Sequence, residues 1–138
     1  MSATNICVLK NRHAGQTVHV VASGASVDFI HPSYFEPEVV VTVNEMFRHV
    51  KAACLYALMH HHEHAQEAIN AGHQLVTSER DWGMPGWGKA ASLLGDYFAY
   101  RTAENTLSLT PAIDVVALAE DTSDSLVVSA CTTAEALQ

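Results

Sequence analysis

Basic side chains are scarce in this sequence, in which 7 Lys and Arg residues stand against 15 Asp and Glu residues, for a formal net charge of -8. An acidic excess of this size repels a phosphate backbone and offers no basic stripe to nucleic acid or anionic lipid. Long apolar runs are missing too: none approaches the roughly 20 residues that span a bilayer, and no basic segment leads into an apolar signal core. We therefore expect a cytoplasmic chain that binds neither nucleic acid nor a membrane.

Cysteine is equally sparse, with 3 residues that lie far apart: Cys7, Cys54 and Cys131. Their odd number and their spacing argue against a disulfide framework and against a zinc knuckle. The apolar neighbours of Cys7 and Cys54 favour small buried hydrophobic side chains in a reducing compartment. Because 49% of the 138 residues are hydrophobic and 16% are charged, the chain can bury one core, and we expect a single domain over residues 1–138.

What the sequence does contain is a series of short apolar runs, rich in β-branched residues and separated by stretches typical of helices or turns. The clearest strands are expected over residues 18–22 and 39–43, and Pro32 and Pro37 limit the connection between them to a short helical turn. This alternation is the pattern of βαβ units. It predicts an α/β, Rossmann-like fold with a mainly parallel sheet of about four or five strands and flanking helices.

The sequence signals for the later helices and strands differ in strength. Residues 61–72 are rich in helix formers and close on Gly72, a typical C-terminal cap, and residues 73–79 predict a short strand. Other stretches are assigned as follows: 52–59 and 113–119 as strand or helix, 80–88 as a loop, 89–106 as ambiguous with helix in part, and 126–129 as a strand running into a helix. Because that last helix reaches Gln138 without a cap, we expect a domain that is incomplete at its C-terminal end.

One turn raises a functional question. The stretch "VHVVASGASVDFI", residues 18–30, breaks an expected buried strand with Ser23, Gly24, Ala25 and Ser26. Open α/β sheets bind ligands at the carboxyl ends of their strands, where amides and hydroxyls of such a turn could hold a phosphate. A strand-to-helix turn that needs one glycine explains the same residues about equally well, and the full G-x-G-x-x-G dinucleotide motif is absent.

A resemblance to known proteins favours the interpretation of this turn as a ligand site. The segments "LKNRHAGQTVHVVASGASVDFI" and "VVVTVNEMF" resemble a group of Rossmann-like proteins that includes sialyltransferases using a cytidine-monophosphate donor sugar. The same group includes the family related to 6-hydroxymethylpterin diphosphokinase and to flagellin-glycosylation proteins. The resemblance covers about residues 9–47, is faint over 73–82 and returns over 125–138.

Carried over by position, the resemblance implies a nucleotide site. Ser23, Gly24, Ala25 and Ser26 would form its phosphate side, and Asn44, which follows the second strand, would contact the nucleotide or its sugar. The segment "LVVSACTTAEAL" is similar to a further strand, turn and helix of the group, which adds candidates from its turn: Ser129, Thr132 and Thr133. Two departures bear on activity: Ala25 replaces a usual proline, and the strand that would follow residue 138 in the group is missing.

The histidine run "MHHHEHAQE" offers candidate catalytic residues at His60, His62 and His64. His60 and His64 are four apart and would share a helix face, but the register is not the H-E-x-x-H of a zinc protease. A solvent-exposed, histidine-rich helix start is therefore favoured over a dedicated metal site. If residues 52–59 are a strand, the run faces the same crevice as Ser23 and Asn44, where a histidine could neutralise phosphate or protonate a leaving group.

Other polar and aromatic residues have simpler explanations. Trp82 and Trp87 lie in the glycine-rich loop and are expected to anchor it to the core, although a lid that stacks on a base is the alternative. Arg80 and Asp81 fit either the crevice or a surface ion pair. No Ser-His-Asp arrangement and no paired carboxylates stand in a recognisable context.

Two hypotheses follow from these observations. The first is a domain that binds a nucleotide or nucleotide sugar in a glycosyl- or diphospho-transferase-like protein, and the diphosphokinase type would need Mg²⁺. The second is a non-catalytic module of a phage or mobile element that keeps the fold to sequester a ligand or bind a protein. An open sheet edge would make a homodimer a sensible expectation in either case.

Overall fold

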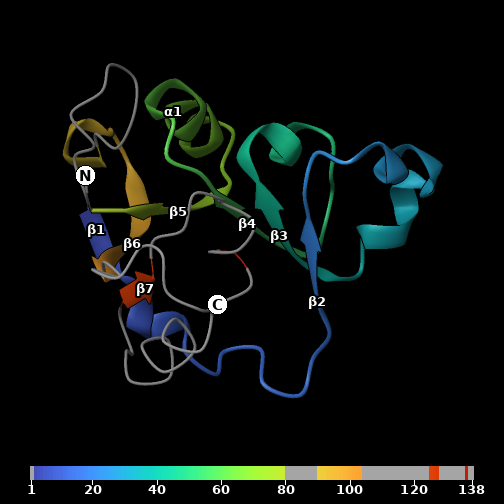
Figure 1. Cartoon of the computed structure of the whole chain (residues 1–138), viewed down its shortest axis with the longest axis horizontal. Coiled ribbons are helices and arrows are strands. Elements are labelled where there is room, and N and C mark those ends of the chain that lie inside the picture. Colours follow the sequence, from blue (N-terminus) through green and yellow to red (C-terminus); the bar gives the residue numbers. More distant parts are fainter. Residues whose placement is uncertain (1, 80–89, 104–124, 128–135, 137–138) are drawn as a thin grey trace, which may run out of the picture.

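The computed structural model describes residues 2–79, 90–103, 125–127 and 136, and these form one parallel sheet (Figure 1). The seven strands are β1 (Ser2–Asn5), β2 (Val18–Val21), β3 (Val39–Val43), β4 (Cys54–Leu58), β5 (Gln74–Ser78), β6 (Asp96–Ala103) and β7 (Ser125–Val127). Their order is β1-β6-β5-β4-β3-β2, and β7 pairs with the last part of β6. All the pairings are parallel, which confirms the α/β, Rossmann-like prediction.

Helices are few and short. Five are 3₁₀ turns: η1 (Ile6–Leu9), η2 (Ala25–Phe29), η3 (Pro32–Phe35), η4 (Asn44–Arg48) and η5 (Ala90–Ser92). The single described α-helix is α1 (His62–Asn70). It ends where the sequence predicts: Gly72 has φ +82°, its amide donates to the Ile69 carbonyl, and the His73 amide donates to the Ala68 carbonyl. This pair of bonds is a Schellman cap, for which glycine is preferred because it adopts positive φ without strain.

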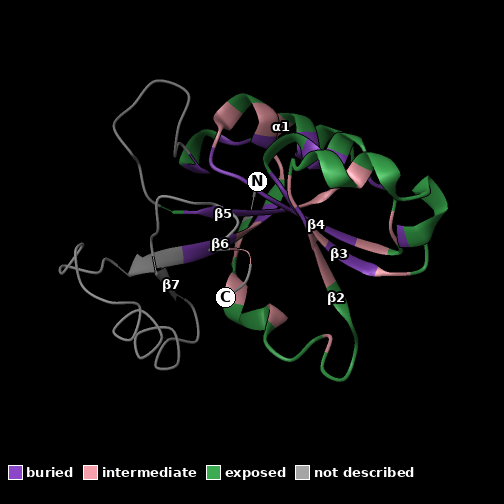
Figure 2. Cartoon of the chain, turned by 45° about the vertical axis from the view of Figure 1, so that its right-hand side comes forward, coloured by how far each residue is buried: buried purple, intermediate pink, exposed green. Residues whose placement is uncertain are grey.

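The strand order determines on which face each connection lies. From β2 to β6 every step reaches the neighbouring strand in the same direction, so right-handed crossovers place these connections on one face. The connection from β1 to β2 returns across the whole sheet and lies on the opposite face (Figure 2). We call the first the helix face and the second the crossover face. The crossover is residues 6–17.

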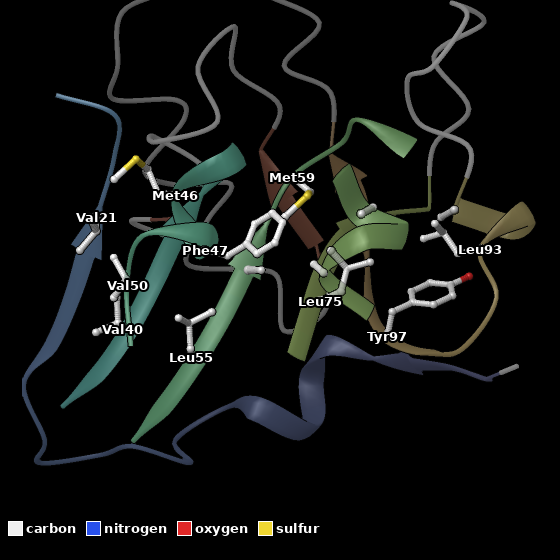
Figure 3. Close-up of a cluster of buried hydrophobic side chains, with 14 of the residues drawn as sticks. Val21, Val40, Met46, Phe47, Val50, Leu55, Met59, Leu75, Leu93 and Tyr97 are labelled. Carbon is white, nitrogen blue, oxygen red and sulfur yellow. The ribbon is translucent and has the colours of Figure 1, made fainter. Parts of the chain in front are cut away.

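Each face has its own apolar core, because neighbouring residues of a strand point to opposite sides. On the helix face, strand residues such as Val40, Leu55 and Leu75 pack with Phe47 of η4 and with α1 (Figure 3). On the crossover face, a smaller cluster of Val39, Tyr56, Leu58, Val76 and Tyr100 is covered by Ile6 and Leu9 of η1 and by Ala136. Strands buried on both faces read as nearly continuous apolar runs, which is why β3, apart from Thr42, and β4 are apolar.

Several predictions of the elements need correction. The number of strands was too low, because β1 was not predicted and β6 lies in the stretch expected to be helical in part. Residues 52–59, for which strand and helix both stayed open, form β4, and residues 73–79 form β5 as predicted. The strand predicted over 126–129 is β7 at Ser125–Val127 as far as it is described, and residues 128 and 129 lie outside the described residues. Residues 80–88 and 113–119 lie outside the described residues.

Strand β2 stands at the end of the sheet order, so its outer edge carries no strand among the described residues. Large apolar side chains near this edge are exposed, above all Phe29, with 91% of its surface accessible. A cavity of about 770 Å³ runs between β2 and the η2 and η3 turns. The expected homodimer has a candidate surface here and stays a prediction. In the described part of the chain, no helix has the length and apolar character that crossing a bilayer requires.

Candidate functional site

The carboxyl ends of β2, β3 and β4 bring the predicted site segments to one edge of the sheet. Ser23 to Ser26 follow β2, Asn44 follows β3 and the histidine run follows β4, and these three strands are direct neighbours. The buried polar residues of the described chain gather at the same edge, at the ends of β3, β4 and β5: Thr42, His60, Thr77 and Ser78. Burying polar groups costs free energy unless they are hydrogen-bonded, so their concentration at one edge marks it as the candidate site.

A cavity of about 430 Å³ opens between the turn after β2 and the turn after β3. Ser23, Gly24, Ala25 and Asp28 line it from the first turn, and Met46 and His49 line it from the second. Both turns lie on the helix face, so the cavity is not a crevice between connections on opposite faces. Across this cavity, the turn predicted to bind phosphate faces the connection that follows β3.

Gly24 is not required by the backbone. Its φ of -68° and ψ of 145° are accessible to any residue. A Cβ added to Gly24 would meet only Ser26 Oγ, at 3.7 Å, which is an ordinary contact. The interpretation of "ASGAS" as a turn that needs one glycine therefore has no conformational basis here. What glycine provides at this exposed position is a backbone that a ligand can approach closely.

Asn44, in contrast, has a conformational reason to be asparagine. Its φ is +54°, in the left-handed region where asparagine is several-fold enriched, and it turns the chain from β3 into η4. The side chain is exposed and Asn44 does not line the described cavity, although Met46 and His49 of the same turn do. The predicted contact with a nucleotide therefore needs a test that keeps this backbone conformation.

The predicted histidines do not act as one group. Helix α1 begins at His62, and His61 has extended φ and ψ, so His60 and His64 do not share a helix face as predicted. His60 is buried with 7% of its surface accessible, and its Nε2 lies 3.1 Å from the Tyr100 hydroxyl. It points to the crossover face because it continues the alternation of β4 after Leu58. His60 therefore links the end of β4 to the middle of β6.

His64 is the more accessible histidine. Its Nδ1 lies 3.4 Å from Glu45 Oε1, directly after Asn44, and its ring stacks on His61 with centroids 4.3 Å apart. Nε2 of His62 is buried without a hydrogen-bond partner among the described residues. Of the three predicted residues, His64 is thus the one that faces the turn after β3. A histidine held beside a carboxylate is suited to accept or donate a proton.

Charge at this edge is mainly acidic. Asp28 lines the cavity, Glu45 contacts His64, and Arg48 binds Glu67 of α1 through two bonds, one of them 2.8 Å from Nε to Oε1. The hydrogen bond to Glu67 raises the pKa of Arg48, and the same bond lowers the pKa of Glu67. Arg48 is thus paired with a carboxylate, and it does not line the described cavity.

Sequence reasoning missed Asp28, Glu45, His49 and Tyr100 at this edge. Asp28 stands in the segment that was singled out, five residues after Ser23, so its position was visible in the sequence. Tyr100 gave no signal, because β6 was not predicted. Several predicted residues lie outside the described chain: Ser129, Thr132, Thr133, Arg80, Asp81, Trp82 and Trp87.

The described residues contain no group of three or more His, Cys, Asp or Glu side chains that could hold a metal ion by themselves. Asp28 alone could still provide one oxygen to a magnesium ion that a nucleotide carries, since Mg²⁺ often binds through one carboxylate and the phosphates. Comparisons with family models, with curated proteins and with solved structures give no match.

Proposed function

We propose that this chain binds the phosphate of a nucleotide or nucleotide sugar at the carboxyl edge of β2, β3 and β4, as a domain of a glycosyl- or diphospho-transferase-like protein. The observation that carries the proposal is the cavity between the two turns, lined by Ser23, Gly24 and Ala25. Gly24 there is open to a ligand and is not required by the backbone. The resemblance of residues 9–47 to nucleotide-binding proteins points the same way.

Each residue at the site has a role in this proposal. The Ser23 hydroxyl and the backbone amides of the turn donate to phosphate oxygens. The predicted residue Ser26 lines the cavity of about 770 Å³ beside β2 instead. Asp28 holds a Mg²⁺ ion that arrives with a diphosphate, which offsets the repulsion between that carboxylate and the ligand. His64, which contacts Glu45, is the candidate general acid for a leaving group. His60 supports the edge from the buried side through its contact with Tyr100.

A specific observation favours the second candidate function, a ligand-sequestering or protein-interaction module without catalysis. Phosphoryl and glycosyl transfer rely on cations that stabilise developing charge. At the described edge Arg48 is engaged by Glu67, and Asp28 adds negative charge to the cavity. A site of this kind could bind a magnesium nucleotide and yet transfer nothing.

The test is a thermal-shift screen against CMP, CDP, UDP, GDP, ADP, ATP and a pterin, with and without Mg²⁺. A ligand at about 100 times its dissociation constant adds about 2.7 kcal/mol of stability, which shifts the melting temperature of a domain this size by several degrees. We expect a selective shift with one nucleotide that Gly24→Ala and Ser23→Ala abolish. Thr17→Ala, which changes a hydroxyl just before the amino end of the same strand, is the matched control and should leave the shift intact.

Two further variants separate the parts of the proposal. Asn44→Gly removes the amide and keeps the positive φ, so a loss of binding would assign the side chain to the ligand. Asp28→Asn should abolish only the Mg²⁺-dependent part of the shift. Absence of a shift with every ligand would refute the proposal, whereas binding without turnover at saturating nucleotide sugar or ATP would support the non-catalytic module.

A further inference from the structure

A second cluster of chemically active side chains lies at the opposite, amino edge of the sheet. Cys54 is the first residue of β4 and is partly exposed. His13 belongs to the crossover and reaches this strand from the crossover face. Its Nε2 lies 3.8 Å from Cys54 Sγ and 2.7 Å from the Tyr56 hydroxyl. These contacts join the crossover to β4 at a site that is separate from the candidate nucleotide site.

The orientation of the His13 ring is determined by a third residue. Its Nδ1 lies 2.8 Å from Gln16 Oε1, and because an amide oxygen only accepts, the proton sits on Nδ1. Nε2 is then the unprotonated nitrogen that faces Cys54 and Tyr56. A nucleophile, a base and a residue that orients the base are the arrangement that activates a cysteine thiol.

Groups around the sulfur favour its anionic form. Gln74 Nε2 donates to Cys54 Sγ at 3.5 Å. Burial and a hydrogen bond with Cys54 raise the pKa of Tyr56 to about 12, so the hydroxyl keeps its proton. It donates this proton to His13 Nε2 at 2.7 Å, which leaves its oxygen to accept from the Cys54 thiol. Arg12, next to His13 in the chain, adds positive charge near the Tyr56 hydroxyl. Donors and nearby cations stabilise a thiolate relative to a thiol.

We infer that Cys54, with His13 as its base and Gln16 as the residue that orients it, is a nucleophilic thiol and the site of reversible modification by a low-molecular-weight disulfide. The Tyr56 proton moves to His13 Nε2 as the Tyr56 oxygen takes the thiol proton, and the thiolate attacks one sulfur of the disulfide. The new S–S bond forms as the old one breaks, and the other half leaves as a thiolate that takes up the proton from His13. Cys54 is oxidised, and the disulfide is reduced.

Modification would have a structural effect. A group attached to Cys54 Sγ occupies the space beside His13 Nε2 and so displaces the contact that joins the crossover to β4. The crossover connects β1 to β2 across the whole sheet. We therefore expect the modified chain to exchange its amide hydrogens faster over residues 6–17, while the protection of α1 stays unchanged.

The experiment measures the rate of alkylation of each cysteine by iodoacetamide in the native full-length chain, by peptide mass spectrometry, from pH 5 to 10. Cys7, which is exposed and not buried as its apolar neighbours predict, is the internal reference. An ordinary thiol is only a few per cent ionised at pH 7, so Cys54, with a base that accepts its proton, should react on the order of tenfold faster than Cys7 at that pH. Its rate should reach half its maximum at a lower pH than the rate of Cys7 does.

Variants distinguish an activated thiol from an accessible one. His13→Gln should raise the pH midpoint of Cys54 toward that of Cys7, and Gln16→Ala should raise it by a smaller amount. His31→Gln, at an exposed histidine near the β2 edge, should change nothing. The midpoint reports ionisation, which a change in accessibility alone would not move. If His13→Gln fails to fold, the Gln16→Ala midpoint, on an exposed side chain, decides the question.

Glutathione disulfide is then the probe for the modification itself. We expect a mixed disulfide on Cys54 that dithiothreitol removes, and a slower reaction in His13→Gln. A Cys54 midpoint equal to that of Cys7 in the wild-type chain would overturn the assignment, and so would a mixed disulfide that forms on Cys7 in preference to Cys54.

Discussion

Gly95 lies directly against Ile69, so that a Cβ on Gly95 would stand 2.4 Å from Ile69 Cγ2. The two residues join the segment before β6 to α1. The contact is reinforced by Gln66, whose side chain accepts from the Leu94 amide and donates to the Leu94 carbonyl, both at 2.8 Å. Close approach of helix and backbone at this point is possible only because residue 95 has no side chain.

Gly95→Ala should therefore destabilise the chain. Its φ of +124° disfavours any L-residue, and the new Cβ must displace Ile69, which together cost about 2 to 4 kcal/mol. Urea unfolding measures this loss. Gly72→Ala is the matched control, since it has φ +82° with no atom within 4 Å of the new Cβ, and should cost only about 1 to 2 kcal/mol. Equal losses in the two variants would mean that Ile69 moves aside freely.

Gly24→Ala should leave the free energy of unfolding unchanged or raise it by about 0.4 to 1 kcal/mol, because the native backbone suits alanine and the unfolded chain loses freedom. The same urea titration, without ligand, measures it. A loss of more than 1 kcal/mol would show that the turn after β2 does need glycine for its own structure.

Tyr56 should ionise late in the folded chain. Burial is the first cause that raises its pKa to about 12, from an ordinary value of 10. A raised pKa in the fold means that Tyr56 contributes stability below pH 10 and loses this contribution as the pH rises toward 12. Absorbance at the tyrosinate band, compared between the wild-type chain and Tyr56→Phe, follows the group. If a tyrosinate transition near pH 10 is present in the wild-type chain and missing in Tyr56→Phe, then Tyr56 ionises at its ordinary pKa and the expectation is wrong.

The pairing of Arg48 with Glu67 should stabilise the contact of η4 with α1 only modestly, because both side chains are exposed and salt screens them. The lowered pKa of Glu67 means that its contribution is present above the ordinary pKa of glutamate and disappears as the pH falls through the lowered value. A double-mutant cycle of Arg48→Met and Glu67→Gln at pH 7 should give a coupling energy, and the cycle at low pH should give none. Unchanged coupling at low pH would rule out an ionic origin.

A homodimer through the β2 edge should depend on its exposed apolar side chains. Phe29→Ser removes the most exposed of these, and light scattering would then report a shift from dimer toward monomer. Leu94→Ser, with 70% of the wild-type side chain accessible on a different part of the surface, is the control and should leave the state unchanged. If the wild-type chain is monomeric at high concentration, the prediction of a homodimer is wrong.

The fold class could be predicted from the sequence because strands buried on both faces appear as continuous apolar runs. β3 is such a run, and Gly72 marks the end of α1 for a local steric reason. β6 could not be predicted, since "DYFAYRTA" mixes alanine, polar and aromatic residues that suit either element. β1 is a short polar strand at the edge, whose pairing with β6 depends on contacts distant in sequence.

The candidate site was predictable in its position more than in its details. Consecutive parallel strands place Ser23, Asn44 and the histidine run at one edge, and that much follows from the order of elements. The different environments of His60 and His64 do not follow from that order, because they depend on the residue at which α1 begins. A helix starting at His62 turns His60 back into the sheet and leaves His64 beside Glu45.

The pairing of β1 with β6 has a consequence for how the chain acquires its structure. Ser2 pairs with Asp96, so β1, which is synthesised before β2 to β5, finds its partner only after those strands have left the ribosome. Contacts this distant in sequence slow folding. Until β6 is synthesised, the outer edge of β5 also lacks its neighbouring strand. Nascent chains cut before residue 96 should therefore recruit chaperones, and completion of β6 should be the step that releases them.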